Sequence, residues 1–305
     1  MNHRHVMITL PAKLSVQNEQ IMIRRRESNQ ETNEEVIHIP LEDVDSILIE
    51  SAVVTVTAMF MAKCSEYRVV VFFCDDKHMP STISLPFQQH SRLSAVFEMQ
   101  LNLRKPLINR IWQEIVMAKI ENQAACLNKL QRDHVDKMLT IAHSVQSADK
   151  NNREAYAARI YFSSLFNERF RRTEPNEINA ALNYGYAILR GLVARSIVVY
   201  GFMPHMGLFH HNDFNAFALA DDWVEPFRPF FDYFVYINQD RIEERGLTTE
   251  IKRMIYSILS TEIAVGNENY NFSVAVERVI EGFLRCCKEN DLKYLVFPRF
   301  LGEKE

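Results

Sequence analysis

The sequence predicts an α+β protein, with a small β-rich N-terminal domain followed by a larger, all-helical C-terminal domain. Up to about residue 86 the apolar residues form short β-branched runs separated by polar turns. After residue 88 they recur at intervals of three and four residues, which is the spacing of amphipathic helices. Strands followed by helices, rather than alternating with them, are typical of this fold class. We therefore expect one domain over residues 1–87 and a second over residues 88–305.

Several short runs in the first domain have the composition of strands. They are HVMITL, AKLSVQ, QIMIRRR, EVIHIPL, SILIE and RVVVFFC. The polar stretch ESNQETNEE at 27–35 is typical of a hairpin tip, and DDKHMPSTISLPF at 75–87 predicts a last short hairpin and a linker. The segment VTVTAMFMAKCSEY begins as a strand, but Ala58, Met59, Met61 and Ala62 then follow helical spacing. It therefore predicts a helix packed on the sheet.

The second domain contains long stretches with helical periodicity. We expect helices in SRLSAVFEMQLN, PLINRIWQEIVMAKIENQAACLNKL, REAYAARIYFSSLF, EINAALNYGYAILRGLVARSIVVYG and TEIKRMIYSILSTEIAV, the last covering residues 249–265.

Composition excludes several classes of protein. Only 8 of the 305 residues are Gly, and neither the P-loop nor the G-x-G-x-x-G pattern occurs, which argues against nucleotide-binding enzymes of those kinds. The five cysteines form no C-x-x-C pair, so a reduced, cytoplasmic setting is expected rather than a disulfide framework. The first residues resemble no signal peptide, and no apolar run approaches the 18 or so residues of a membrane span.

Charge is distributed unevenly along the chain. The net charge is −4, yet residues 90–200 carry 16 Lys and Arg against 10 Asp and Glu. Such a basic middle section could bind a polyanion, although a solvated helical surface has the same composition.

Glu154 is the first candidate for a functional carboxylate. Ala157, Ala158 and Tyr161 follow it at helical spacing, so its side chain is expected on the inward face, where a carboxylate needs a metal, Arg or His partner. The alternative is a capping box in which Asn151 and Glu154 satisfy the first amides of the helix.

The segment HMGLFHHNDFNAFALADDWVEPFRP provides the other candidates. His205, His210 and His211 precede three acids, Asp221, Asp222 and Glu225, which are expected to share roughly one helical face. Pro226 disfavours α-helical backbone at Glu225 and predicts that this carboxylate lies at a helix end or kink, among the aromatic residues around it. We expect Asp221 to belong to a solvated acidic turn.

Two carboxylates and one imidazole form a mixed oxygen and nitrogen ligand set. Oxygen ligands suit Mg²⁺ or Mn²⁺, and a single His favours Mn²⁺ without excluding Mg²⁺. No H-E-x-x-H motif supports a zinc hydrolase. Such a site beside a basic surface is typical of phosphodiester chemistry.

Together these segments resemble the CRISPR-associated integrase family, the universal adaptation nuclease of bacterial CRISPR systems. The resemblance covers most of the chain and rests on REAYAARIYF, GLFH and, most specifically, LADDWVEPFRP, which is similar to the family pattern L-x-x-D-L-M-E-P-F-R-P. The EPFRP ending and the HHNDFNAF stretch are most similar to the subfamily found beside single-protein RNA-guided effectors, that of type II systems.

The resemblance implies site residues. Matched by motif, the catalytic residues and metal ligands are Glu154, His210 and Glu225, which would bind Mg²⁺ or Mn²⁺. Asp222 is expected in an outer shell or as a backup ligand, and His211 stays an alternative to His210.

The resemblance also implies a reaction and partners. The family is a metal-dependent DNA endonuclease and integrase, in which 3′-hydroxyls of a captured double-stranded DNA fragment attack phosphodiesters at the ends of a CRISPR repeat. It implies a homodimer formed through the N-terminal domain, and two such dimers flanking a dimer of a small ferredoxin-like adaptation protein in a heterohexamer. It leaves open whether the RNA-guided effector nuclease is a further partner.

Basic residues of the middle section are candidates for contacts with DNA phosphates, which position DNA without reading its sequence. They are Arg92, Arg104, Lys105, Lys119, Arg153 and Arg159. The alternative function is a non-catalytic DNA-binding scaffold of the adaptation complex.

Overall fold

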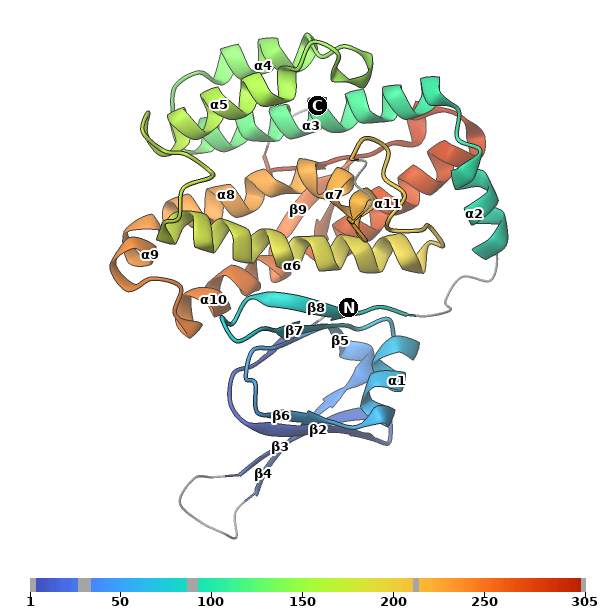
Figure 1. Cartoon of the computed structure of the whole chain (residues 1–305), viewed down its shortest axis with the longest axis vertical. Helices are drawn as coiled ribbons and strands as arrows, with labels where there is room; N and C mark the ends of the chain where they lie inside the picture. Colours follow the sequence, from blue (N-terminus) through green and yellow to red (C-terminus); the bar gives the residue numbers. More distant parts are fainter. Residues whose placement is uncertain (1–3, 27–33, 87–92, 211–213, 303–305) are drawn as a thin grey trace. The chain divides into compact units, whose positions relative to one another are not determined.

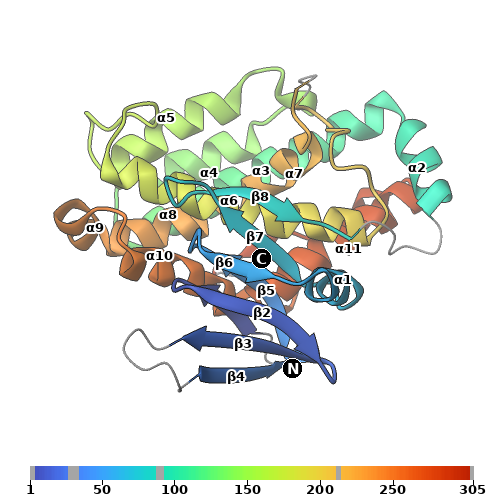
Figure 2. The ribbon, with the colours of Figure 1, turned by 60° about the horizontal axis from the view of Figure 1, so that its bottom comes forward.

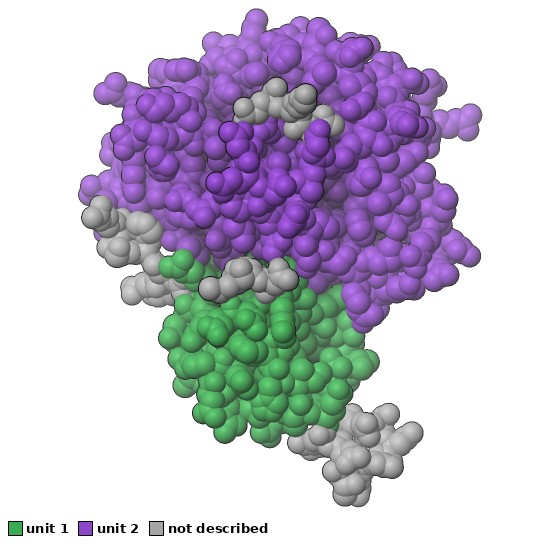
Figure 3. Space-filling model, turned by 180° about the vertical axis from the view of Figure 1, so that it is seen from behind, with its two compact units in different colours: residues 1–89 green, residues 90–305 purple. Residues whose placement is uncertain are grey.

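The computed structural model describes residues 4–26, 34–86, 93–210 and 214–302. The chain divides into two compact units, Met1–Gln89 and His90–Glu305 (Figure 3). The expected hairpin tip at 27–35 falls almost entirely outside the described residues.

The first unit contains two four-stranded sheets within the described residues, with strand orders β1-β5-β7-β8 and β4-β3-β2-β6 (Figures 1 and 2). Strands β1, β5 and β7 run parallel, and β8 pairs antiparallel with β7. In the other sheet β4, β3 and β2 run antiparallel, and β6 pairs parallel with β2. The elements of this unit are β1 Arg4–Ile8, β2 Ala12–Gln17, β3 Gln20–Arg26, β4 Glu34–Pro40, the 3₁₀ turn η1 Leu41–Asp43, β5 Val44–Ile49, β6 Val54–Val56, α1 Ala58–Glu66, β7 Val70–Cys74 and β8 Pro80–Ser84.

The two sheets of this unit share one apolar core. Leu14 and Ile23 of one sheet lie in the same buried cluster as Ile47 and Val71 of the other. Helix α1 adds Phe60 to this cluster, and its first turn is capped by the hydroxyl of Thr57. The predicted change from strand to helix within VTVTAMFMAKCSEY is thus confirmed.

The second unit is built around two long helices, α3 and α6 (Figure 1). Most of α6 is buried, because α7, α8, α10 and α11 all pack on it. The helices of this unit are α2 Leu93–Leu101, α3 Lys105–Lys129, α4 Val135–His143, α5 Arg153–Leu165, α6 Glu177–Val199, α7 Ala218–Val224, α8 Arg228–Ile237, α9 Gln239–Arg245, α10 Thr249–Tyr256 and α11 Phe272–Glu289, with 3₁₀ turns η2 Ser147–Asp149, η3 Glu225–Phe227, η4 Ser257–Ser260 and η5 Leu292–Tyr294.

The second unit had been expected to be all-helical. This expectation is wrong, because the unit also contains strands. A small sheet of order β10-β9-β11 joins β9 Glu262–Val265, β10 Glu268–Asn271 and β11 Pro298–Arg299. The helix expected over 249–265 therefore ends at Tyr256. Ile263 and Val265 suit a strand, and Gly266, at φ +60°, closes the hairpin to β10. The α+β fold class is confirmed with this addition.

Two further expectations concern cysteines and membranes. All five cysteines are free thiols. Within the described ranges, none of the helices combines the length and apolar character that crossing a membrane requires.

Candidate active site

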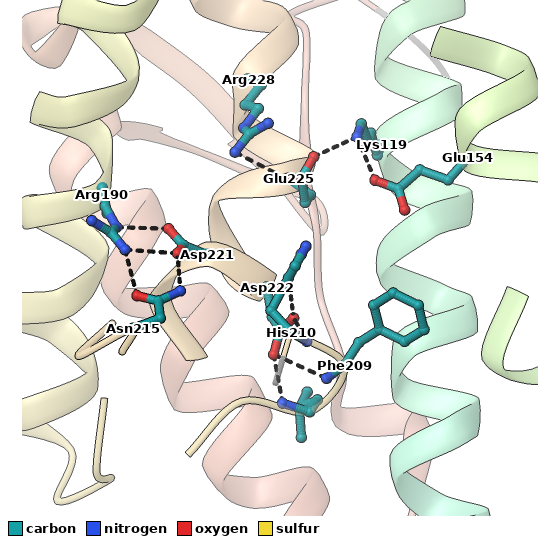
Figure 4. Close-up of polar contacts among 11 residues, drawn as sticks. Lys119, Glu154, Arg190, Phe209, His210, Asn215, Asp221, Asp222, Glu225 and Arg228 are labelled. Carbon is teal, nitrogen blue, oxygen red and sulfur yellow. Dashed lines mark hydrogen bonds and ion pairs between the residues drawn. The ribbon is translucent and has the colours of Figure 1, made fainter. Parts of the chain in front are cut away.

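Glu154 and Glu225 lie on different elements but converge on one cation, the ammonium of Lys119. Lys119 Nζ lies 2.6 Å from Glu154 Oε1 and 2.5 Å from Glu225 Oε2 (Figure 4). The side chains of Lys119 and Glu225 are only 10% and 4% exposed, so this ion pair is largely shielded from water. Arg228 completes the group at 3.1 Å from Glu225 Oε1. Helices α3 and α5 and the α7–α8 junction thus meet at these charges.

The position of Glu154 is fixed by the start of α5. The carboxylate of Asp149 accepts hydrogen bonds from the backbone amides of Arg153, at 2.7 Å, and Glu154, at 3.1 Å. It therefore satisfies two amides that the first turn of a helix leaves unpaired. The capping box, which was the alternative reading of Asn151 and Glu154, does not form, because Asn151 instead bonds the amide of Gln146 and the carbonyl of Ser144.

Glu225 lies at the end of α7, as expected, but its backbone is helical. Its φ and ψ are −54° and −48°, so Glu225 adopts the helical conformation that Pro226 was expected to disfavour. Pro226 is the second residue of the 3₁₀ turn η3, where a missing amide hydrogen leaves no helical hydrogen bond unmade. Asn122 of α3 donates to the Pro226 carbonyl at 2.8 Å and holds this turn against α3.

His210 is oriented by Asp222. The Asp222 carboxylate accepts from the amides of Leu208, Phe209 and His210, and lies 2.7 Å from His210 Nδ1 (Figure 4). A Cβ on Gly207 would lie 2.4 Å from the His210 carbonyl oxygen, so this turn requires glycine. With Nδ1 bonded to a carboxylate, Nε2 is the nitrogen that remains for a ligand, a common arrangement at metal sites.

The 208–210 turn also packs on α3. The ring of Phe209 stacks on that of buried Trp112 with centroids 4.4 Å apart, and the His210 ring meets the same indole edge-on. Of the rival histidines, His205 is exposed and His211 lies outside the described residues.

The three acids of this segment do not share a partner or a face. Asp221 accepts two hydrogen bonds of 2.7 Å from Arg190 and one from Asn215, so the expectation of a solvated acid is wrong (Figure 4). Asp222 faces the 208–210 turn, and Glu225 faces Lys119 and Arg228.

Opposite charges determine the ionisation of the group. Burial opposes a charge on Glu225, but Arg228 and Lys119 outweigh it and lower the pKa of this carboxyl. Burial also opposes a charge on Lys119, but Glu225 and Glu154 raise its pKa. The hydrogen bond to Asp222 raises the pKa of His210 against the effect of burial, and the charges of Glu225 and Glu154 add to the rise.

The basic residues expected at DNA divide into two kinds. The expectation that Lys119 contacts DNA phosphates is wrong, since its ammonium is buried in ion pairs rather than presented to solvent. Arg104, Lys105 and Arg159 are exposed, and the guanidinium groups of Arg153 and Arg159 both lie over the ring of Tyr156. Arg92 lies outside the described residues.

Sequence reasoning missed a basic cavity of about 800 Å³ next to this group. Its lining includes Lys119, Arg159, Arg171, Arg172, Tyr186 and Arg228. The guanidinium groups of Arg172 and Arg228 both lie over the ring of Tyr186. Arg171 and Arg172 stand in the basic section of the sequence, which was the signal that could have identified them.

The residues fit a divalent ion in their chemistry, but not in their present positions. Among the described residues, no three His, Cys, Asp or Glu side chains gather closely enough to hold a metal. Two carboxylates nevertheless already share one cation, and His210 has the outer-shell carboxylate typical of a metal-binding imidazole. A divalent ion would have to take the place of the Lys119 ammonium.

The sequence of this chain matches one protein family and named members of it. Residues 6–262 match the family described as CRISPR associated protein Cas1. The CRISPR-associated endonuclease Cas1 of Neisseria meningitidis serogroup C (strain 8013) is 36% identical over 100% of this chain and 99% of its own length. That of Francisella tularensis subsp. novicida (strain U112) is 23% identical over 74% of this chain and 78% of its own.

Solved structures share the fold. A casposase bound to its integration product superposes with a TM-score of 0.77 at 19% identity, covering 94% of this chain and 91% of the casposase. A Cas1 protein from Thermotoga maritima gives a TM-score of 0.72 at 18% identity, with 99% and 100% coverage. With the family match and the Neisseria relative, these findings establish that the chain belongs to the Cas1 family of CRISPR-associated proteins.

Proposed function

We propose that this protein is a metal-dependent DNA integrase and endonuclease that inserts captured DNA fragments into a CRISPR array. The observation that carries this proposal is the convergence of Glu154 and Glu225 on one cation position. The relative from Neisseria is named an endonuclease, and the casposase is bound to an integration product, which supports a DNA-joining reaction.

Each side chain has a task in this proposal. Glu154, Glu225 and His210 would hold Mg²⁺ or Mn²⁺, which lowers the pKa of an attacking 3′-hydroxyl and stabilises charge on the scissile phosphate. Asp222 engages Nδ1 of His210, so Nε2 is the ring nitrogen that would bind the ion. Arg104, Lys105, Arg153 and Arg159 would hold the phosphates of double-stranded DNA. The DNA hydroxyl is the nucleophile, so no covalent protein intermediate forms.

The proposal extends to partners. We expect a homodimer formed through the first unit, and two such dimers on either side of a dimer of the small adaptation protein. A solved Cas6-RT-Cas1–Cas2 complex, whose matched chain this protein covers to 36% with a TM-score of 0.71, contains Cas1 together with Cas2 and supports a complex with such a partner.

A strand-transfer assay tests the proposed function. It contains the purified full chain, the small adaptation partner, a short duplex with free 3′-hydroxyls and a repeat-bearing target, with Mn²⁺ or EDTA. Replacing Glu154 by Gln, Glu225 by Gln or His210 by Ala should each lower metal-dependent joining at least about 100-fold, because each change removes a metal ligand. DNA binding should persist in all three variants.

Asp221→Asn is the matched control. Asp221 is an acid one turn from Glu225 that pairs with Arg190, so this variant should retain joining. Retained joining in any two of the three ligand variants would contradict the site. Metal-independent DNA binding without any joining by the wild type would instead indicate the non-catalytic scaffold.

A further inference from the structure

Lys119 occupies the position that the proposed metal would need. Its Nζ lies within 2.6 Å of an oxygen from each of the two carboxylates, and its side chain is 10% exposed. A metal ion bound by the same carboxylates would lie about 2.1 Å from their oxygens. The ammonium and the ion therefore compete for the same lone pairs.

The charges of the group are already balanced without a metal. Two carboxylates, Glu154 and Glu225, face two cations, Lys119 and Arg228. A divalent ion added to this arrangement would lie beside an ammonium in a largely buried site, where like charges repel strongly. Binding of the ion thus requires that one of the two cations withdraw.

Lys119 is the cation that has space to withdraw. It lines the cavity of about 800 Å³ described above, together with Gln123 and Asp232. The lysine stem is flexible, and its ammonium makes no planar, two-pronged contact that would fix it in place. Arg228 also lines this cavity, but its guanidinium is stacked over Tyr186.

We infer that Lys119 is a built-in competitor of the metal. In the metal-free protein it holds Glu154 and Glu225 together, and it withdraws into the adjoining cavity when a divalent ion binds. This inference rests on the proposed function, because it assumes that these carboxylates bind a divalent ion. Its consequence is that the protein sets its metal affinity below the value that its ligands alone would give.

A titration of the full chain with Mn²⁺ tests this inference. The free ion is measured by electron paramagnetic resonance. Lys119→Met removes the competing charge and keeps the length of the side chain, so the Kd for Mn²⁺ should fall at least about tenfold. Lys119→Arg should raise the Kd above that of the wild type, because a guanidinium can bind both carboxylates at once. Lys129→Met, on the same helix, is the control and should leave the Kd unchanged.

Thermal unfolding provides a second measurement. In EDTA, Lys119→Met should lower the Tm, since two buried carboxylates lose their shared partner. Saturating Mn²⁺ should then raise the Tm of this variant more than that of the wild type. If Lys119→Met does not fold, Lys119→Arg still tests the competition. A Kd of Lys119→Arg for Mn²⁺ that equals the wild-type value or lies below it would contradict the inference.

The outcomes separate this inference from the proposed function. If Glu225→Gln abolishes Mn²⁺ binding while Lys119→Met binds no more tightly than the wild type, the metal site stands and the role of Lys119 is overturned. If neither the wild type nor Lys119→Met binds Mn²⁺, the metal site fails and the inference fails with it.

Discussion

At the scale of single residues, Asp222 is best understood as the side chain that positions His210. It is fully buried, and its oxygens accept from three consecutive amides and from the imidazole of His210. An ionised carboxylate has about four lone-pair sites for accepting hydrogen bonds, and these donors occupy all of them. These contacts favour a role for Asp222 in orienting His210 over the backup metal ligand that the sequence had left open, and we propose that role.

Asp222→Asn tests that role. The amide keeps the shape but turns one acceptor into a donor that faces other donors. We expect the affinity for Mn²⁺ to fall about 10- to 100-fold, and the free energy of unfolding to fall by about 1–3 kcal/mol. Metal titration and urea unfolding measure the two effects, with Asp221→Asn as the control. An unchanged Mn²⁺ affinity in a folded Asp222→Asn variant would remove the positioning role.

Residues of the candidate site could be selected from the sequence, but their partners could not. Glu154 was expected to face inward and to need a partner, and the structure supplies one in Lys119, 35 residues earlier. Helical spacing relates residues three or four positions apart. It carries no information on a contact between α3 and α5, so Lys119 was assigned to the DNA surface.

At the scale of elements, the N-terminus of α5 determines where Glu154 lies. Asp149 bonds the first two amides of this helix from a turn in which Asp149 and Asn152 both have positive φ. Asp149→Ala should lower the free energy of unfolding by about 1–2 kcal/mol, since it removes a helix cap. Hydrogen exchange at the amides of Arg153 and Glu154 should become faster.

Asn151→Ala distinguishes this cap from the capping box. Asn151 bonds residues 144 and 146 and makes no bond to the first turn of α5. Exchange at the Arg153 and Glu154 amides should therefore stay as slow as in the wild type. If exchange at these two amides became faster in Asn151→Ala and stayed unchanged in Asp149→Ala, Asn151 rather than Asp149 would be the cap of α5.

Helical periodicity predicted the long elements and missed a short one. Residues 106–130 and 177–201 repeat their apolar positions over several turns, and α3 and α6 form there. In 249–265 the same spacing continues into Glu262–Val265, yet these residues form β9. Four residues are too few to separate the two periods, and pairing with β10 and β11 determines the result.

At the scale of the whole molecule, a buried carboxyl joins three helices of the second unit. Asp232 of α8 is 1% exposed and accepts hydrogen bonds from the hydroxyls of Tyr161 in α5 and Tyr186 in α6. Burial raises the pKa of Asp232 to about 6, although both tyrosine hydroxyls oppose the rise. The ionisation of one residue is thus linked to the stability of the packing of α5, α6 and α8.

This linkage predicts how stability depends on pH. Since its pKa is raised in the folded state, Asp232 stays protonated there between pH 4 and 6, while the unfolded chain, with a pKa near 3.8, loses the proton. The contribution of Asp232 to stability is therefore full below about pH 4, falls by about 3 kcal/mol as the pH rises to about 6, and is constant above. Asp232→Asn cannot titrate, so the difference in unfolding free energy between the wild type and this variant should change by that amount across the window.

Tyr161→Phe removes a hydrogen bond that favours the ionised form of Asp232, and should move the upper end of the window to higher pH. Urea unfolding at pH 4, 5, 6 and 7 measures these differences, and parallel curves for the wild type and Asp232→Asn would show that this carboxyl does not link ionisation to folding.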